Sequence, residues 1–154
     1  MKKNAFTLME LLAVIALLAI IAIIVTPTII NSLQNARQNA FKDDVTMLVK
    51  AANNYYNESN ITADIMVPLM TTYTAGQKTQ FTKQTNGSCQ SVNEGLEYSG
   101  KGPDSGQIYI DQNGNVELKL YSKTVNKCAV KGLNDKDIKL EDIAQSACTL
   151  GRSC

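Results

Sequence analysis

The chain has few residues that could carry out catalysis, because it contains no histidine. Without histidine, neither a Ser-His nor a Cys-His pair can activate a nucleophile. The sequence also lacks a G-x-S-x-G turn, a phosphate-binding loop and an H-E-x-x-H zinc motif. We therefore expect the protein not to be an enzyme and to need no cofactor.

The cysteines are the next candidates for chemistry, and all four lie in the polar C-terminal part of the chain: Cys89, Cys128, Cys148 and Cys154. No two of them form a C-x-x-C pair, which argues against a zinc site in a chain without histidine. In an exported protein we expect two disulfides. Of the three possible pairings we favour Cys148–Cys154, which closes a small C-terminal loop, together with Cys89–Cys128.

Acidic residues near the C-terminus are weak candidates for calcium ligands, since calcium takes carboxylate oxygens. The candidates are Asp135, Asp137 and Asp142. An acidic loop is more often simply solvated, so we expect no bound metal.

A carboxylate beside an apolar segment is the most unusual feature of the chain. Glu10 directly precedes fifteen consecutive apolar residues, Leu11–Val25. Residues 6–30 would form a helix of ~37 Å, enough to cross a hydrocarbon core of ~30 Å. Lys2 and Lys3 favour a cytoplasmic N-terminus, so the rest of the chain would face outward. A carboxylate at the lipid-facing start of such a helix is costly and implies a partner.

Two simpler interpretations of this segment are a cleavable secretory signal and an uncleaved membrane anchor. A secretory signal needs small residues at the first and third positions before its cut. Residues 25–28 offer no good site of this kind, and Glu10 interrupts the usual passage from charged to apolar residues. Neither alternative explains the carboxylate.

The segment Ala5-Phe6-Thr7-Leu8-Met9-Glu10-Leu11-Leu12 resembles the type IV prepilin signature of pilins and pseudopilins. In that family a peptidase at the cytoplasmic face cuts before a Phe that is followed by Thr-Leu-x-Glu. The resemblance implies that Phe6 becomes the N-methylated mature N-terminus and that Glu10 pairs with the Phe6 amine of a neighbouring subunit. Ala5 departs from the family, which usually has Gly before the cut. Pro27 lies where many pilins have a helix-bending proline.

Beyond Pro27, apolar residues recur at helical spacing along one face, which predicts an amphipathic helix that packs on a sheet: Phe41, Val45, Leu48, Ala52 and Tyr55. We expect one helix from about Phe6 to about Tyr56, bent or loosened near Pro27. The predicted organisation is a leader over 1–5, a membrane and assembly half-helix over 6–30, an amphipathic half-helix over 31–57, and an exported head over 58–154.

Alternating apolar residues after Gly106 predict strands. The pair Asn113-Gly114 separates two such runs and is a strong hairpin signal. A third strand is expected over 124–130 and a possible fourth over 138–143. Residues 60–89 show little periodicity and are predicted to be loop with a short helix or strand. The expected fold class is α+β: a pilin fold in which the long helix packs on an antiparallel sheet of three to four strands.

The resemblance implies a structural subunit of a type IV pilus or pilus-like filament. Its expected partners are prepilin peptidase, the membrane assembly machinery, and copies of itself or other pilins. Its expected location is the cytoplasmic membrane as a single-pass precursor, then an extracellular filament or the cell surface. Without residues 1–5 the chain has 13 basic and 14 acidic residues, so no specific nucleic acid partner is evident. The alternatives are a pseudopilin of a type II secretion or competence (DNA-uptake) system, or a monomeric membrane-anchored adhesin.

Overall fold

A computed structural model describes residues 7–61, 68–75, 77–85, 88–92, 96, 98 and 100–152, with the side chains of 59–61, 77–85, 88–90 and 92 left out of the description. The chain divides into two compact units, Met1–Ala36 and Arg37–Cys154. We call them the N-terminal unit and the C-terminal unit.

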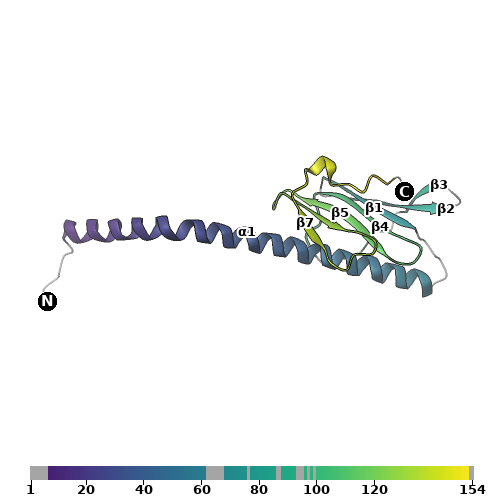
Figure 1. Cartoon of the computed structure of the whole chain (residues 1–154), viewed down its shortest axis with the longest axis horizontal. Helices are drawn as coiled ribbons and strands as arrows, with labels where there is room; N and C mark the ends of the chain where they lie inside the picture. Colours follow the sequence, from purple (N-terminus) through teal and green to yellow (C-terminus); the bar gives the residue numbers. More distant parts are fainter. Residues whose placement is uncertain are drawn as a thin grey trace. The chain divides into compact units, whose positions relative to one another are not determined.

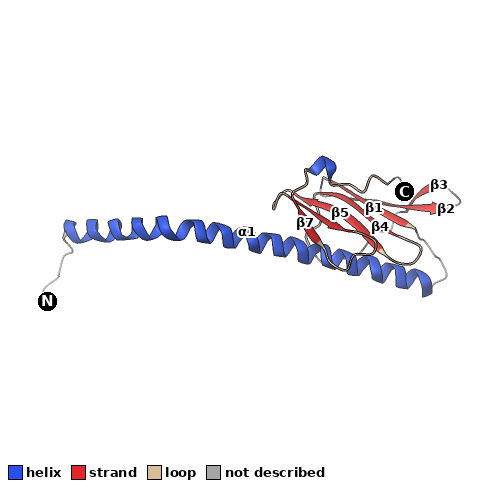
Figure 2. Cartoon of the chain, viewed as in Figure 1, coloured by secondary structure: helices blue, strands red, loops and turns tan. Residues whose placement is uncertain are grey.

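The N-terminal unit consists of the first part of α1, which runs from Leu8 to Ile61. The helix is unbroken (Figure 2), and Pro27 lies inside it. It also ends beyond the Tyr56 expected from the sequence. The bend at Pro27 stays a prediction. Nearby, the Thr26 hydroxyl donates a hydrogen bond to the carbonyl of Ala22 at 2.5 Å, which is a common arrangement for threonine inside a helix.

In the C-terminal unit, the rest of α1 covers one face of an antiparallel sheet (Figure 1). The strand order is β3-β2-β1-β4-β5-β6-β7. The strands are β1 (Leu69–Thr74), β2 (Gln77–Thr85), β3 (Ser88–Val92), β4 (Ser105–Ile110), β5 (Val116–Ser122), β6 (Lys127–Lys131) and β7 (Lys139–Glu141). A short 3-10 helix, η1 (Gln145–Ala147), follows them.

The fold class predicted from the sequence is confirmed, but the strand count was too low. The expected strands after Gly106 are β4 to β7. The prediction of loop with one short helix or strand over 60–89 is wrong in extent, because this region contains β1, β2 and the start of β3. These strands are rich in Thr and Gln, so their polar composition hides the alternation. Threonine nevertheless favours strands because it is β-branched.

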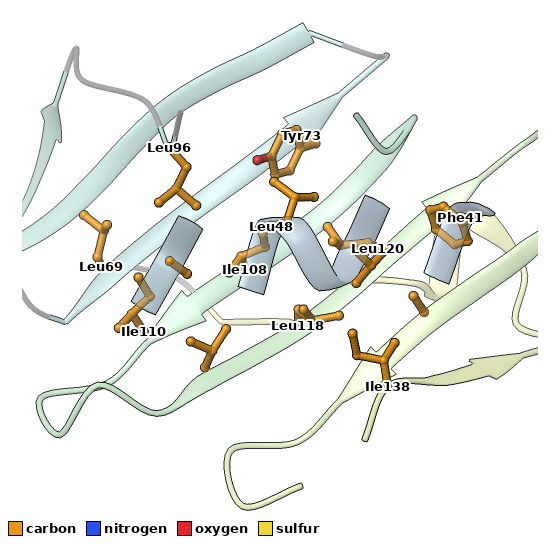
Figure 3. Close-up of a cluster of buried hydrophobic side chains, with 14 residues drawn as sticks. Phe41, Leu48, Leu69, Tyr73, Leu96, Ile108, Ile110, Leu118, Leu120 and Ile138 are labelled. Carbon is orange, nitrogen blue, oxygen red and sulfur yellow. The ribbon is translucent and has the colours of Figure 1, made fainter. Parts of the chain in front are cut away.

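The predicted helical stripe forms the core of the C-terminal unit. Phe41, Val45, Leu48 and Ala52 are buried, and Tyr55 packs against the same cluster. From the sheet they meet alternate residues of β1, β4, β5 and β6, because successive side chains in a strand point to opposite faces. These include Leu69, Tyr73, Ile108, Ile110, Leu118, Leu120 and Ala129 (Figure 3 labels most of them).

The predicted hairpin around Asn113-Gly114 joins β4 to β5, with Ile110 opposite Val116. The Asp111 carboxylate stabilises the turn by accepting hydrogen bonds from the backbone N–H groups of Asn113 and Asn115, at 2.9 and 2.7 Å. Gly114 has φ +81°, and a Cβ there would lie 2.6 Å from the Tyr56 ring. Glycine is therefore required both by the backbone conformation and by the close approach of α1.

Candidate functional site

The first turn of α1 holds Glu10 in a reciprocal hydrogen-bonding arrangement with Thr7. Glu10 Oε2 accepts hydrogen bonds from the Thr7 backbone N–H and from the Thr7 hydroxyl, both at 2.9 Å. In return, the Glu10 backbone N–H donates to Thr7 Oγ1 at 3.3 Å. This arrangement is a capping box, which satisfies backbone donors that the start of a helix leaves unpaired.

The capping box gives Glu10 a role that our sequence reasoning missed, although Thr-x-x-Glu before an apolar run is its signature. In lipid, unpaired N–H groups are costly, so a cap matters more there than in water. The carboxylate also lies at the positive end of the helix dipole. Both bonds from Thr7 go to Oε2, and neither uses Oε1.

Ala5 and Phe6, the expected residues of the cleavage and methylation site, lie outside the described residues. Glu10 lies in the first turn of α1, four residues beyond Phe6 in sequence. Pro27 lies within the same helix.

The apolar side chains that follow Glu10 are exposed along the whole first part of the helix. Ile23, for example, has 76% of its surface accessible. The helix is long and apolar enough to cross a membrane. Because so large an apolar surface is unfavourable in water, this segment needs lipid or other helices around it.

The cysteine pairing differs from the expected one. Cys128 in β6 is bonded to Cys148, with 5.9 Å between their Cα atoms. Both predicted pairs are therefore wrong, since each of them uses one of these two cysteines. Cys148 and Cys128 pack with Tyr121 in a small buried cluster. The remaining candidates, the Cys89 side chain and Cys154, lie outside the described part of the chain.

Pairing Cys128 with Cys148 holds the C-terminal segment against the face of the sheet opposite α1. The Gln107 side-chain oxygen accepts hydrogen bonds from the Thr149 hydroxyl and the Leu150 N–H, at 2.8 and 3.1 Å. Further along, Arg152 forms an ion pair with Glu117, with 2.8 Å between Nη2 and Oε2. The Arg152 guanidinium also lies 4.5 Å from the centre of the Tyr109 ring. The C-terminal segment thus covers part of the second face, over β4, β5 and β6.

Two of the three weak calcium candidates have other contacts. Asp142 forms an ion pair with Lys127 at 2.5 Å, and Asp135 accepts a hydrogen bond from the Gly132 N–H at 3.2 Å. Within the described ranges, no group of three or more carboxylates or thiols is placed to hold a metal ion.

Comparison with known proteins bears on the N-terminal unit. The family model of the prokaryotic N-terminal methylation motif matches residues 1–26, which include Phe6 and Glu10. No curated protein and no solved structure matches the chain. The chain therefore carries the type IV prepilin signature at the start of a long apolar helix. This arrangement supports the interpretation of the chain as a type IV pilin-like protein.

Proposed function

We propose that this protein is a structural subunit of a type IV pilus or pilus-like filament, made as a membrane-anchored precursor. The observation that carries the proposal is the methylation motif over residues 1–26, continuous with an exposed apolar helix. A motif of this kind implies processing by prepilin peptidase. Cleavage between Ala5 and Phe6 would remove the leader with Lys2 and Lys3.

Because the apolar surface of the first part of α1 is exposed, we expect the N-terminal unit to occupy two environments in succession. In the precursor, lipid surrounds the helix. In the filament, the corresponding helices of neighbouring subunits replace lipid, because their apolar side chains pack against the surface that lipid covered before. The C-terminal unit has its own core, so it can remain folded in both environments.

Glu10 is proposed to direct the transfer from lipid to filament. Its carboxylate attracts the cationic amine of Phe6 in a neighbouring subunit, and methylation leaves that amine charged. A charge pair in apolar surroundings is favourable only at the correct axial offset between helices, so the pair sets the register. The capping bonds hold the carboxylate at the start of the helix, where such an amine can reach it.

The processing step is tested by mass spectrometry of the protein from cells with and without an active prepilin peptidase. We expect a mature chain that begins at Phe6 and carries one additional methyl group, and an intact precursor in the cells without the enzyme. Recovery of only the intact chain from both cell types would contradict the proposal and favour a simple membrane anchor. If the processed chain forms filaments, their length on the cell surface separates a pilus from the short filament of a pseudopilin.

A further inference from the structure

Lys131 occupies a position in the C-terminal unit where a core residue would be expected. It lies at the end of β6, opposite the buried Leu118 of β5. Ala129, two residues earlier in the strand, faces the core beneath α1, so Lys131 falls on the same face. Only 9% of the Lys131 surface is exposed. A lysine buried to this extent normally has a compensating partner.

The partners of the Lys131 amine are neutral. It donates hydrogen bonds to the backbone carbonyls of Val116 and Gly132, at 2.6 and 3.2 Å. No ion pair joins it to a carboxylate within the part of the chain that the structure describes. Burial lowers the pKa of this amine, and the more distant charges of Asp135 and Glu117 only partly oppose that effect. Two carbonyls leave one of its three N–H donors for another acceptor.

Lys131 is one of the residues that line a pocket of about 340 Å³. Its walls come from α1, the turn between β4 and β5, and the loop between β6 and β7. The polar side chains that line it include Asn53, Lys131, Asn134, Asp135 and Lys136. Lys136 adds a second positive charge to this lining, and Asp135 is its one acidic residue. The Asp135 carboxylate accepts a hydrogen bond from the Gly132 N–H.

We propose that this pocket binds a small oxyanion, a phosphate or carboxylate group, with Lys131 as its principal ligand. The oxyanion supplies the charge that the buried amine lacks, and Asn53, Asn134 and Lys136 surround it with further donors. All of these residues lie in the C-terminal unit, so the inference does not depend on the proposed role of the N-terminal helix.

A purely structural role for Lys131 is the competing explanation, since its hydrogen bond to the Val116 carbonyl ties the start of β5 to the end of β6. That role needs no pocket and no ligand. It predicts that replacing the lysine changes only the stability of the fold, and that added anion has no effect on the protein with or without the lysine. The two roles are therefore separated by a binding measurement.

The experiment measures binding of inorganic phosphate, and separately of acetate, to the full chain in a non-ionic detergent by isothermal titration calorimetry. We expect at least one of the two anions to bind, and to raise the midpoint of thermal unfolding. Lys131→Met keeps the apolar stem and removes the amine, so the affinity should fall by at least about tenfold. Lys136→Gln should weaken binding less. Lys139→Gln, an exposed lysine outside the pocket, is the matched control and should not change it.

Near-ultraviolet circular dichroism checks that each variant retains its folded core. If Lys131→Met fails to fold, Lys131→Arg keeps the charge and should retain measurable anion binding. The inference is overturned if neither phosphate nor acetate binds the unmodified chain. It is also overturned if a folded Lys131→Met chain binds the anion as tightly as the unmodified one does.

Discussion

The two parts of α1 present their apolar residues to different partners. In the N-terminal unit, the side chains between Leu8 and Leu33 are exposed, so their partners must come from outside the chain. In the C-terminal unit, the stripe from Phe41 to Ala52 is buried against the sheet of the same chain. The comparison teaches that one continuous helix can serve two functions. Its first part has an apolar surface suited to contact with lipid or with neighbouring subunits, and its second part forms the core of a folded unit with the sheet.

Substitution of one leucine in each part of the helix should have opposite consequences. Leu48 is fully buried, so Leu48→Ala should lower the free energy of unfolding of the C-terminal unit by ~2–5 kcal/mol. Leu18 is exposed, and Leu18→Ala should change it by less than ~0.5 kcal/mol. Urea unfolding of the full chain in a non-ionic detergent, followed by near-ultraviolet circular dichroism, measures both. Equal effects of the two substitutions would show that the division of the helix is wrong.

The disulfide between Cys128 and Cys148 should stabilise only the C-terminal unit. Replacing both cysteines by alanine should cost ~2–4 kcal/mol in the same unfolding experiment, because the bridge restricts the unfolded chain. If the protein has two disulfides, Cys89 and Cys154 form the other one, since no other cysteines remain. Peptide mapping without reduction should recover both pairs. Recovery of a Cys148–Cys154 peptide would contradict the observed pairing.

The capping box should have the smallest effect, confined to the start of α1. Thr7→Ala removes the hydroxyl that bonds Glu10 and should weaken the first turn by ~1 kcal/mol, or about fivefold in amide hydrogen exchange. Thr7→Ser keeps a hydroxyl and is the matched control. Exchange at the Glu10 and Leu11 amides in detergent micelles reports the change. Unaltered exchange in Thr7→Ala would mean that the cap does not stabilise the helix there.

The sequence was informative where a local pattern determines the structure. The methylation motif, the Phe41 to Tyr55 stripe and the Asn-Gly hairpin each depend on residues close together in the chain. The strands β1 to β3 were missed because their polar residues give little alternating signal. The pairing of β1 with β4 is a contact between distant parts of the sequence, set by burial of residues such as Leu69 and Tyr73.

The site was only partly predictable for a related reason. Glu10 was identified by its cost in lipid, yet its bonds to Thr7 were overlooked despite a recognisable spacing. The disulfide pairing had no local signal, because it depends on how the C-terminal segment crosses the sheet toward β6. Lys131 was equally hidden, since a lysine at the end of a strand is normally assigned to the surface.

The most direct test of the central claim is the yield of surface filaments from cells that carry only a Glu10→Gln variant. Glutamine keeps the length of the side chain and can still complete a capping box, but it removes the negative charge. Glu10→Leu removes both the charge and the cap and provides the comparison. If the charge pairs with a neighbouring Phe6 amine, both variants should be exported, cleaved and folded as usual, yet yield few filaments and accumulate in the membrane. Normal filament yield from Glu10→Gln would contradict the charge mechanism and leave Glu10 with its capping role alone.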